Sequence, residues 1–102
     1  MVVMIYGFSG RYTGNGAFEW DAPSIGARHR AMLFLLQEDE RDAFDLALAE
    51  CTRFGFDEIQ DLRCGRMQVD ALNSDAYRGF AVFYEEALEA GSALLYYPQT
   101  LA

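Results

Sequence analysis

Apolar residues recur at helical spacing in two segments of this chain, and apolar runs of strand length separate the two segments. Each helical segment is apolar on one side only, so each helix must pack against a sheet or against another helix. The first helix is predicted at residues 40–54, where Asp39 and Asp42 resemble an N-terminal capping pair and Gly55 provides a C-terminal stop.

The second helix is predicted to begin at Asn73 or Ser74, both good N-caps, and to end before Gly91. Its apolar stripe includes Phe83 and Leu88 and is expected to face the core. The opposite side of this helix is therefore expected to face solvent.

Three segments have the composition of β-strands. Residues 2–8, 30–37 and 92–97 are short runs rich in branched and aromatic side chains, and Pro98 is expected to end the last of them. These runs lie before and after the helical segments, so they are expected to form one sheet.

Two further segments are less regular. Residues 56–69 are expected to form one bent strand or a tight hairpin, because Ile59 and Leu62 would lie on opposite faces of an extended chain. In residues 9–27, the dipeptide Asn15-Gly16 is a signal for a small two-residue hairpin.

The predicted order of elements is β, an optional small hairpin, β, α, β, α, β. This order favours a single α+β domain over residues 1–102, with a mainly antiparallel sheet and both helices on one face. The arrangement is expected to be ferredoxin-like or a split βαβ with an added N-terminal strand.

The net charge limits the classes of partner. The chain has 102 residues, sixteen of them acidic and eight basic, which gives a formal net charge of −8. A domain this acidic repels a phosphate backbone, so we expect no direct nucleic-acid binding and favour a basic protein partner. No apolar run has the length of a membrane-spanning helix, so no membrane association is expected. No export signal is recognised at the N-terminus, and we expect a cytoplasmic protein in which Cys51 and Cys64 stay reduced.

The sequence contains no recognisable catalytic set, so an enzyme is not predicted. His29 is the single histidine, and no nucleophile stands at a predictable distance from it. No residue spacing fits a metal site or a nucleotide-binding loop, so neither a metal nor a cofactor is expected. Arg28, His29 and Arg30 form a cationic cluster that could hold a phosphate or carboxylate, and a merely solvated cluster is the alternative.

Local helix rules explain one group of acidic residues. Asp39, Glu40 and Asp42 fall at the expected N-terminus of the first helix, where the helix dipole stabilises negative charge. These residues therefore need no function.

A partner-binding face is predicted on the second helix, where the local rules are broken. Glu85, Glu86 and Glu89 fall in its last two turns, where the dipole disfavours negative charge. Gly79 and Val82 lie on the same outward side. A glycine, an exposed valine and unfavourably placed glutamates on one face indicate a docking surface. The alternative is a solvated face that keeps an acidic protein soluble.

The chain resembles small acidic bacterial immunity proteins, which neutralise toxins delivered by neighbouring cells. The likeness covers roughly residues 30–98 and rests on a strand-helix-strand-helix-strand ending that closes on ALEAGSALLYYP at residues 87–98. The resemblance implies a non-enzymatic inhibitor that binds one cognate toxin and blocks its active site or its access to substrate.

Two other functions stay open at this point. The acidic face would also suit a phage-encoded inhibitor of a nucleic-acid-binding complex, by mimicking phosphate. The third possibility is a ligand-sensing or enzymatic ferredoxin-like domain with a small molecule between sheet and helices. In that case the cluster at residues 28–30 would line the pocket together with four tyrosines, Tyr6, Tyr12, Tyr96 and Tyr97.

Overall fold

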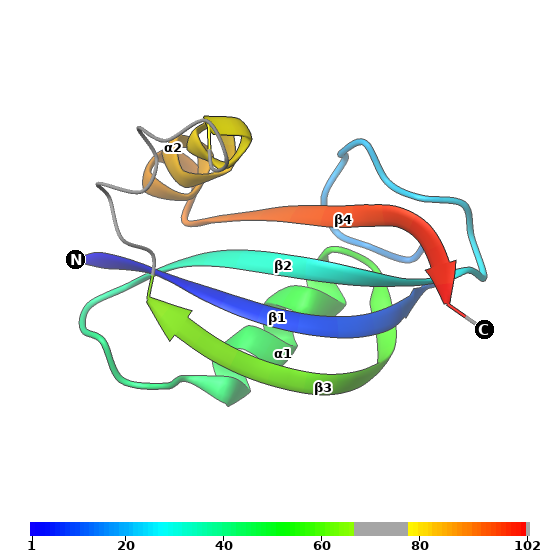
Figure 1. The fold of residues 1–102 in the computed structure, drawn as a ribbon, viewed down its shortest axis with the longest axis horizontal. Helices are drawn as coiled ribbons and strands as arrows, with labels where there is room; N and C mark the ends of the chain where they lie inside the picture. The colour runs from blue at the N-terminus through cyan, green and yellow to red at the C-terminus, as the bar shows by residue number, and fades with distance from the viewer. Residues whose placement is uncertain (67–77, 102) are drawn as a thin grey trace.

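The fold is a four-stranded antiparallel sheet with two α-helices, seen in a computed structural model that describes residues 1–66 and 78–101 (Figure 1). The elements in chain order are β1 (Val2–Tyr12), β2 (Arg28–Gln37), α1 (Phe44–Arg53), β3 (Phe56–Arg66), α2 (Ala81–Ala90) and β4 (Ser92–Leu101). A short 3-10 helix, Arg78–Phe80, leads into α2. The strand order is β3-β1-β2-β4. The predicted α+β class with a mainly antiparallel sheet is confirmed.

β1 is the inserted strand of a split βαβ unit. It lies between β2 and β3 and pairs antiparallel with both, so β2 and β3 run parallel to each other without pairing directly. Because α1 connects these two strands, the unit is the split βαβ that the order of elements predicts, with the N-terminal strand inside it. β4 pairs antiparallel with the other edge of β2.

The two helices cover opposite faces of the sheet, which corrects the expectation that both lie on one face. Tyr6 of β1 packs in one core cluster with Ala47 and Cys51 of α1. Val3, on the other face of β1, packs in a second cluster with Ala87 of α2. The physical reason lies in β1 and β2, whose uninterrupted apolar runs place apolar side chains on both faces, so that each face needs a cover.

Helix α1 begins later than the sequence predicts. Its N-cap is Ala43, without a side-chain cap, and the preceding residues form a loop. Asp39 closes that loop, since its Oδ1 accepts from the Arg41 N–H at 3.0 Å. Asp39, Glu40 and Asp42 therefore lie before the helix and not in its first turn. The predicted stop is confirmed, because Gly55 has φ 101° and its N–H reaches the Thr52 carbonyl.

Helix α2 ends as predicted and is less buried than predicted. Gly91 adopts φ 94° and donates to the Ala87 carbonyl. Leu88, expected in the buried stripe, is 46% exposed. The proposed N-caps Asn73 and Ser74 lie outside the described residues. None of the described helices is long and apolar enough to cross a membrane.

β3 is one bent strand, the first of the two possibilities left open by the sequence. Its register with β1 shifts between Gly7 and Ser9 and again between Ser9 and Arg11. Each shift places an extra residue in β3, and the positive φ angles of Glu58 (49°) and Asp61 (56°) fall in these two stretches. Such bulges bend a strand and redirect its side chains.

Two predictions were wrong: a small hairpin at Asn15-Gly16 and the end of the last strand at Pro98. No small hairpin forms at Asn15-Gly16; residues 13–27 are a loop that joins β1 to β2. The loop packs across the end of α1, where the Ala17 N–H donates to the Arg53 carbonyl at 2.7 Å. β4 continues through Pro98, because this strand lies at the sheet edge and its register against β2 shifts there.

Candidate functional site

The candidate site is a groove on the half of the sheet that α2 leaves open. Helix α2 packs over one end of this face, near Val3 and Phe34. Beyond that end, the same face holds a groove of about 770 Å³. The residues that line it are Ile5, Gly7, Phe8, Arg30, Ala31, Met32, Arg63, Cys64, Gly65, Tyr97, Gln99 and Leu101. A concave surface that is largely apolar and carries few polar groups is the usual form of a small-molecule site.

Two glycines, Gly7 and Gly65, line the groove without adding a side chain that would fill it. Gly7 pairs with Arg63 across β1 and β3, and Ile5 pairs with Gly65. A Cβ at Gly7 would lie 3.2 Å from Arg63 Nε, which places the Arg63 guanidinium over this glycine. A Cβ at Gly65 would meet no heavy atom of the described residues within 4 Å, so none of these residues fills the space above it.

Arg30 and Arg63 bring positive charge to the groove. Both are exposed, and within the described part of the chain the Arg30 side chain has no hydrogen-bond or ion-pair partner. Among these residues, the Arg63 guanidinium donates to the backbone oxygen of Asp61 at 3.4 Å and pairs with no carboxylate. No Asp or Glu belongs to the described lining. On a chain of net charge −8, this groove is a local positive site.

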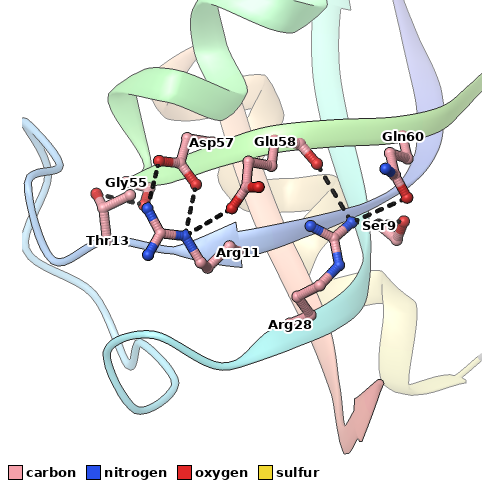
Figure 2. A network of polar contacts seen from close by, with 8 residues as sticks. All are labelled: Ser9, Arg11, Thr13, Arg28, Gly55, Asp57, Glu58 and Gln60. Atoms are coloured by element: carbon pink, nitrogen blue, oxygen red, sulfur yellow. Dashed lines mark hydrogen bonds and ion pairs between the residues drawn. The ribbon is translucent and has the colours of Figure 1, made fainter. Parts of the chain in front are cut away.

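Two neighbouring arginines are held by the fold, as Figure 2 shows. Arg11 of β1 donates to both carboxylate oxygens of Asp57, from Nε at 3.1 Å and from Nη2 at 3.0 Å. Its Nε also lies 2.8 Å from Glu58 Oε2. The hydrogen bonds to Asp57 raise the pKa of Arg11 above its usual value. Arg28 Nη2 donates to the Glu58 carbonyl at 3.2 Å and to Gln60 Oε1 at 3.3 Å. Both arginines therefore tie neighbouring strands together.

The predicted cationic cluster of Arg28, His29 and Arg30 does not form, because alternate residues of β2 point to opposite faces. Arg28 is engaged in the network of Figure 2, and Arg30 points into the groove. His29 faces the other core and is 4% exposed. Its Nδ1 lies 2.8 Å from the Tyr97 carbonyl, which can only accept, so Nδ1 carries the proton.

The four tyrosines proposed for a pocket are also separated. Tyr6 is fully buried, and burial raises its pKa to about 12. Tyr12 and Tyr96 both pack edge-on against Trp20, at centroid distances of 6.0 and 5.9 Å. Only Tyr97 lines the groove, together with Arg30 of the predicted cluster.

The predicted partner-binding residues of α2 do lie on one exposed face. Val82 is 68% exposed, and Glu85, Glu86 and Glu89 follow at intervals of three, four and seven residues. Leu88 adds apolar surface beside them that the sequence assigned to the core. Gly79 lies in the 3-10 helix before α2 and is exposed, so it is not a gap inside α2.

The sequence analysis missed Arg63 and Gly65 as site residues. Their place in the groove depends on the two bulges of β3, which set the face on which Arg63 emerges. Gly65 lies beyond both register shifts, which occur closer to the start of β3. A signal was present in the spacing of Asp57, Gln60 and Arg63, which recur every three residues.

Both cysteines are free thiols in environments that favour the protonated form. Cys51 is fully buried in α1, and burial raises its pKa to about 12. Burial also raises the pKa of Cys64.

Comparison with protein-family models, with curated proteins and with solved structures finds no match to this chain.

Proposed function

We propose that the chain is a non-enzymatic binding protein of the immunity type, which neutralises a basic, cytoplasm-acting toxin through the outer face of α2. The exposure of Val82 is the main support for this proposal, because this apolar side chain is 68% exposed beside Glu85, Glu86 and Glu89. An apolar centre with a charged rim is the usual anatomy of a protein interface, and the negative rim selects a basic partner.

Helix energetics supports the same proposal. Glu85 and Glu89 lie one turn apart and repel each other by a few tenths of a kcal/mol. Negative charge near the C-terminus of a helix is unfavourable by about 0.3–1 kcal/mol. The helix itself carries no basic residue that would offset these terms. A basic partner surface would offset them on binding.

The test compares two variants that lose the same charge. One carries Glu85→Gln, Glu86→Gln and Glu89→Gln, and the control carries changes at three exposed acidic residues outside α2, Glu19→Gln, Asp21→Asn and Asp45→Asn. Each protein is used to capture partners from a host lysate at two salt concentrations. We expect the wild-type and control proteins to retain the same basic partner, and the α2 variant to bind it more weakly and with less salt dependence.

The captured partner is then expressed in the cytoplasm with and without the chain. Growth arrest by the partner alone, relieved by co-expression of the wild-type protein, is the expected result. Equal capture by both variants would overturn docking through α2. A harmless captured partner that binds nucleic acid would instead favour the phage-type inhibitor.

A further inference from the structure

We infer that the groove on the open half of the sheet binds a small organic oxyanion, held by its charged group between Arg30 and Arg63. The ligand class is a carboxylate or a phosphate monoester on an apolar body. This site is separate from the outer face of α2, and the inference does not rest on the proposed function.

The charge distribution supports the choice of an anion. Sixteen acidic residues outnumber eight basic ones in this chain, yet the described groove lining contains two arginines and no carboxylate. In the adjoining network, Arg11 and Arg28 already have acceptors on β3 (Figure 2). Arg30 and Arg63 instead line the groove, and neither of them pairs with a carboxylate among the described residues.

The strand register places Arg30 and Arg63 on the two strands that flank β1, on the same face of the sheet. Arg63 of β3 lies opposite Gly7, and Arg30 of β2 lies opposite Ser9, the next residue of β1 on that face. Gly7 has no side chain, which lets the Arg63 guanidinium reach over β1, the strand that separates it from the strand of Arg30. A planar guanidinium matches the two oxygens of a carboxylate or phosphate, which makes this pair of arginines suitable for an oxyanion.

The remaining walls suit an apolar body. Tyr97 is 43% exposed, and its hydroxyl donates to Met32 Sδ at 3.1 Å, so these two residues line the groove next to each other. Ile5 adds aliphatic surface on β1. The volume of about 770 Å³ is within the range of small-molecule sites, roughly 300–1,000 Å³.

The test is an NMR titration of the whole chain with four probes: phenyl phosphate, benzoate, inorganic phosphate and benzyl alcohol. We expect saturable shifts of the Gly7 and Gly65 amides and of the Met32 methyl group with at least one of the two organic anions, below about 10 mM. Comparing phenyl phosphate with benzoate identifies the preferred oxyanion. Inorganic phosphate is expected to bind more weakly than phenyl phosphate, and benzyl alcohol is expected to cause no saturable shift.

Three variants and one control locate the site. Arg30→Gln and Arg63→Gln should each weaken binding about tenfold or more, because each removes a charge-assisted hydrogen bond. Gly65→Leu should fold, since its side chain enters open space, and should block the groove. Arg41→Gln removes the same charge from a side chain that is 90% exposed outside the groove, and should bind as the wild type does.

The inference is wrong if no probe gives saturable shifts, if the shifts occur outside the groove, or if Arg30→Gln and Arg63→Gln bind as tightly as Arg41→Gln. The amide spectrum of each variant reports its fold directly. If an arginine variant loses its fold, Gly65→Leu decides the question, because unchanged binding in that variant would place the ligand elsewhere.

Discussion

At the residue scale, the hydroxyl group of Tyr6 joins the sheet to the start of α1. It donates to Gln37 Oε1 and accepts from the Ala43 N–H at 2.8 Å. Gln37 in turn donates from Nε2 to the Arg41 carbonyl at 2.8 Å, which fixes the loop before α1. Because no side chain caps α1, this buried network sets where the helix begins.

Removal of this hydroxyl should destabilise the domain. Tyr6→Phe leaves the Ala43 N–H and Gln37 Oε1 without their buried partner, so we expect the free energy of unfolding to fall by about 1–3 kcal/mol. The control is Tyr97→Phe, whose hydroxyl is exposed and contacts only Met32 Sδ among the described residues. Urea denaturation of both variants measures the difference. Equal stability of the two variants would show that the Tyr6 network does not hold the loop.

Burial of two titratable groups makes stability depend on alkaline pH. Burial raises the pKa of Tyr6 from 10.0 to about 12 and that of Cys51 from 9.0 to about 12. Both groups are neutral when protonated, and the folded state holds the proton more tightly than the unfolded chain does. Their contribution is therefore complete below pH 9 and is lost as the pH rises from there to about 12.

The corresponding measurement is urea denaturation at several values between pH 8 and pH 12. We expect the free energy of unfolding to decrease across this interval in the wild type. Cys51→Ala should reduce the decrease that begins near pH 9, and Tyr6→Phe the part that begins near pH 10. An unchanged slope in both variants would mean that other groups control alkaline unfolding.

At the element scale, the bulges of β3 give the strand a repeat of three residues. Asp57, Gln60 and Arg63 pair with Arg11, Ser9 and Gly7, alternate residues on one face of β1. On the other face, Ile59 and Leu62 both pack against the core that α1 covers. A regular strand would place these two apolar residues on opposite faces, as the sequence analysis expected.

The backbone at the second bulge gives a direct test of this arrangement. Asp61 has φ 56°, a region that glycine occupies without steric cost and other residues occupy less readily. Asp61→Gly should therefore raise the free energy of unfolding by about 0.5–1 kcal/mol. Asp61→Asn should have little effect, since asparagine also tolerates this conformation. Loss of stability in Asp61→Gly, measured by thermal and urea denaturation, would contradict a positive φ at this residue.

The elements that could be predicted are those for which a local rule is sufficient. Gly55 and Gly91 mark both helix ends because a left-handed residue is needed there. The start of α1 could not be predicted, because its position depends on Tyr6, which lies 37 residues away in sequence. The hairpin prediction at Asn15-Gly16 was wrong for a similar reason, because the loop around this dipeptide is held by backbone hydrogen bonds to the end of α1.

The candidate site was only partly predictable for the same physical reason. The exposed face of α2 follows from helical periodicity alone, which places Val82 beside the three glutamates, and all four residues are exposed. The groove depends on how all four strands are aligned, which periodicity does not specify. Arg30 was recognised but grouped with His29, a neighbour that faces the opposite core, and Arg63 was missed.

At the scale of the whole molecule, the sheet separates two layers of unequal size. In the described residues, the core cluster under α1 has eleven buried members, among them Leu33, Cys51 and Phe56. The cluster under α2 has four, Val3, Phe34, Ala87 and Ala93. Figure 1 shows α2 over one end of the sheet only, at the end that holds the N-terminus. Because local stability follows buried contacts, α2 is expected to open without unfolding of the sheet.

Neighbouring residues of β2 allow the two layers to be weakened separately. Leu33 and Phe34 are both fully buried, but Leu33 belongs to the α1 layer and Phe34 stacks on Phe83 of α2, with ring centroids 5.8 Å apart. Leu33→Ala should lower the free energy of global unfolding by about 2–5 kcal/mol and accelerate hydrogen exchange throughout the sheet. Phe34→Ala removes a comparable amount of buried surface from the smaller layer.

We therefore expect Phe34→Ala to accelerate exchange of the α2 amides most, while the amides that pair β1 with β2 keep much of their protection. Native-state hydrogen exchange of the two variants under identical conditions measures this difference residue by residue. The physical reason is that α2 has one fully buried residue, the small Ala87, whereas α1 has two, Ala47 and Cys51, in the larger cluster. If both variants accelerated exchange uniformly across sheet and helices, the two layers would form one cooperative unit. The outer face of α2 would then be presented by an element as stable as the sheet itself.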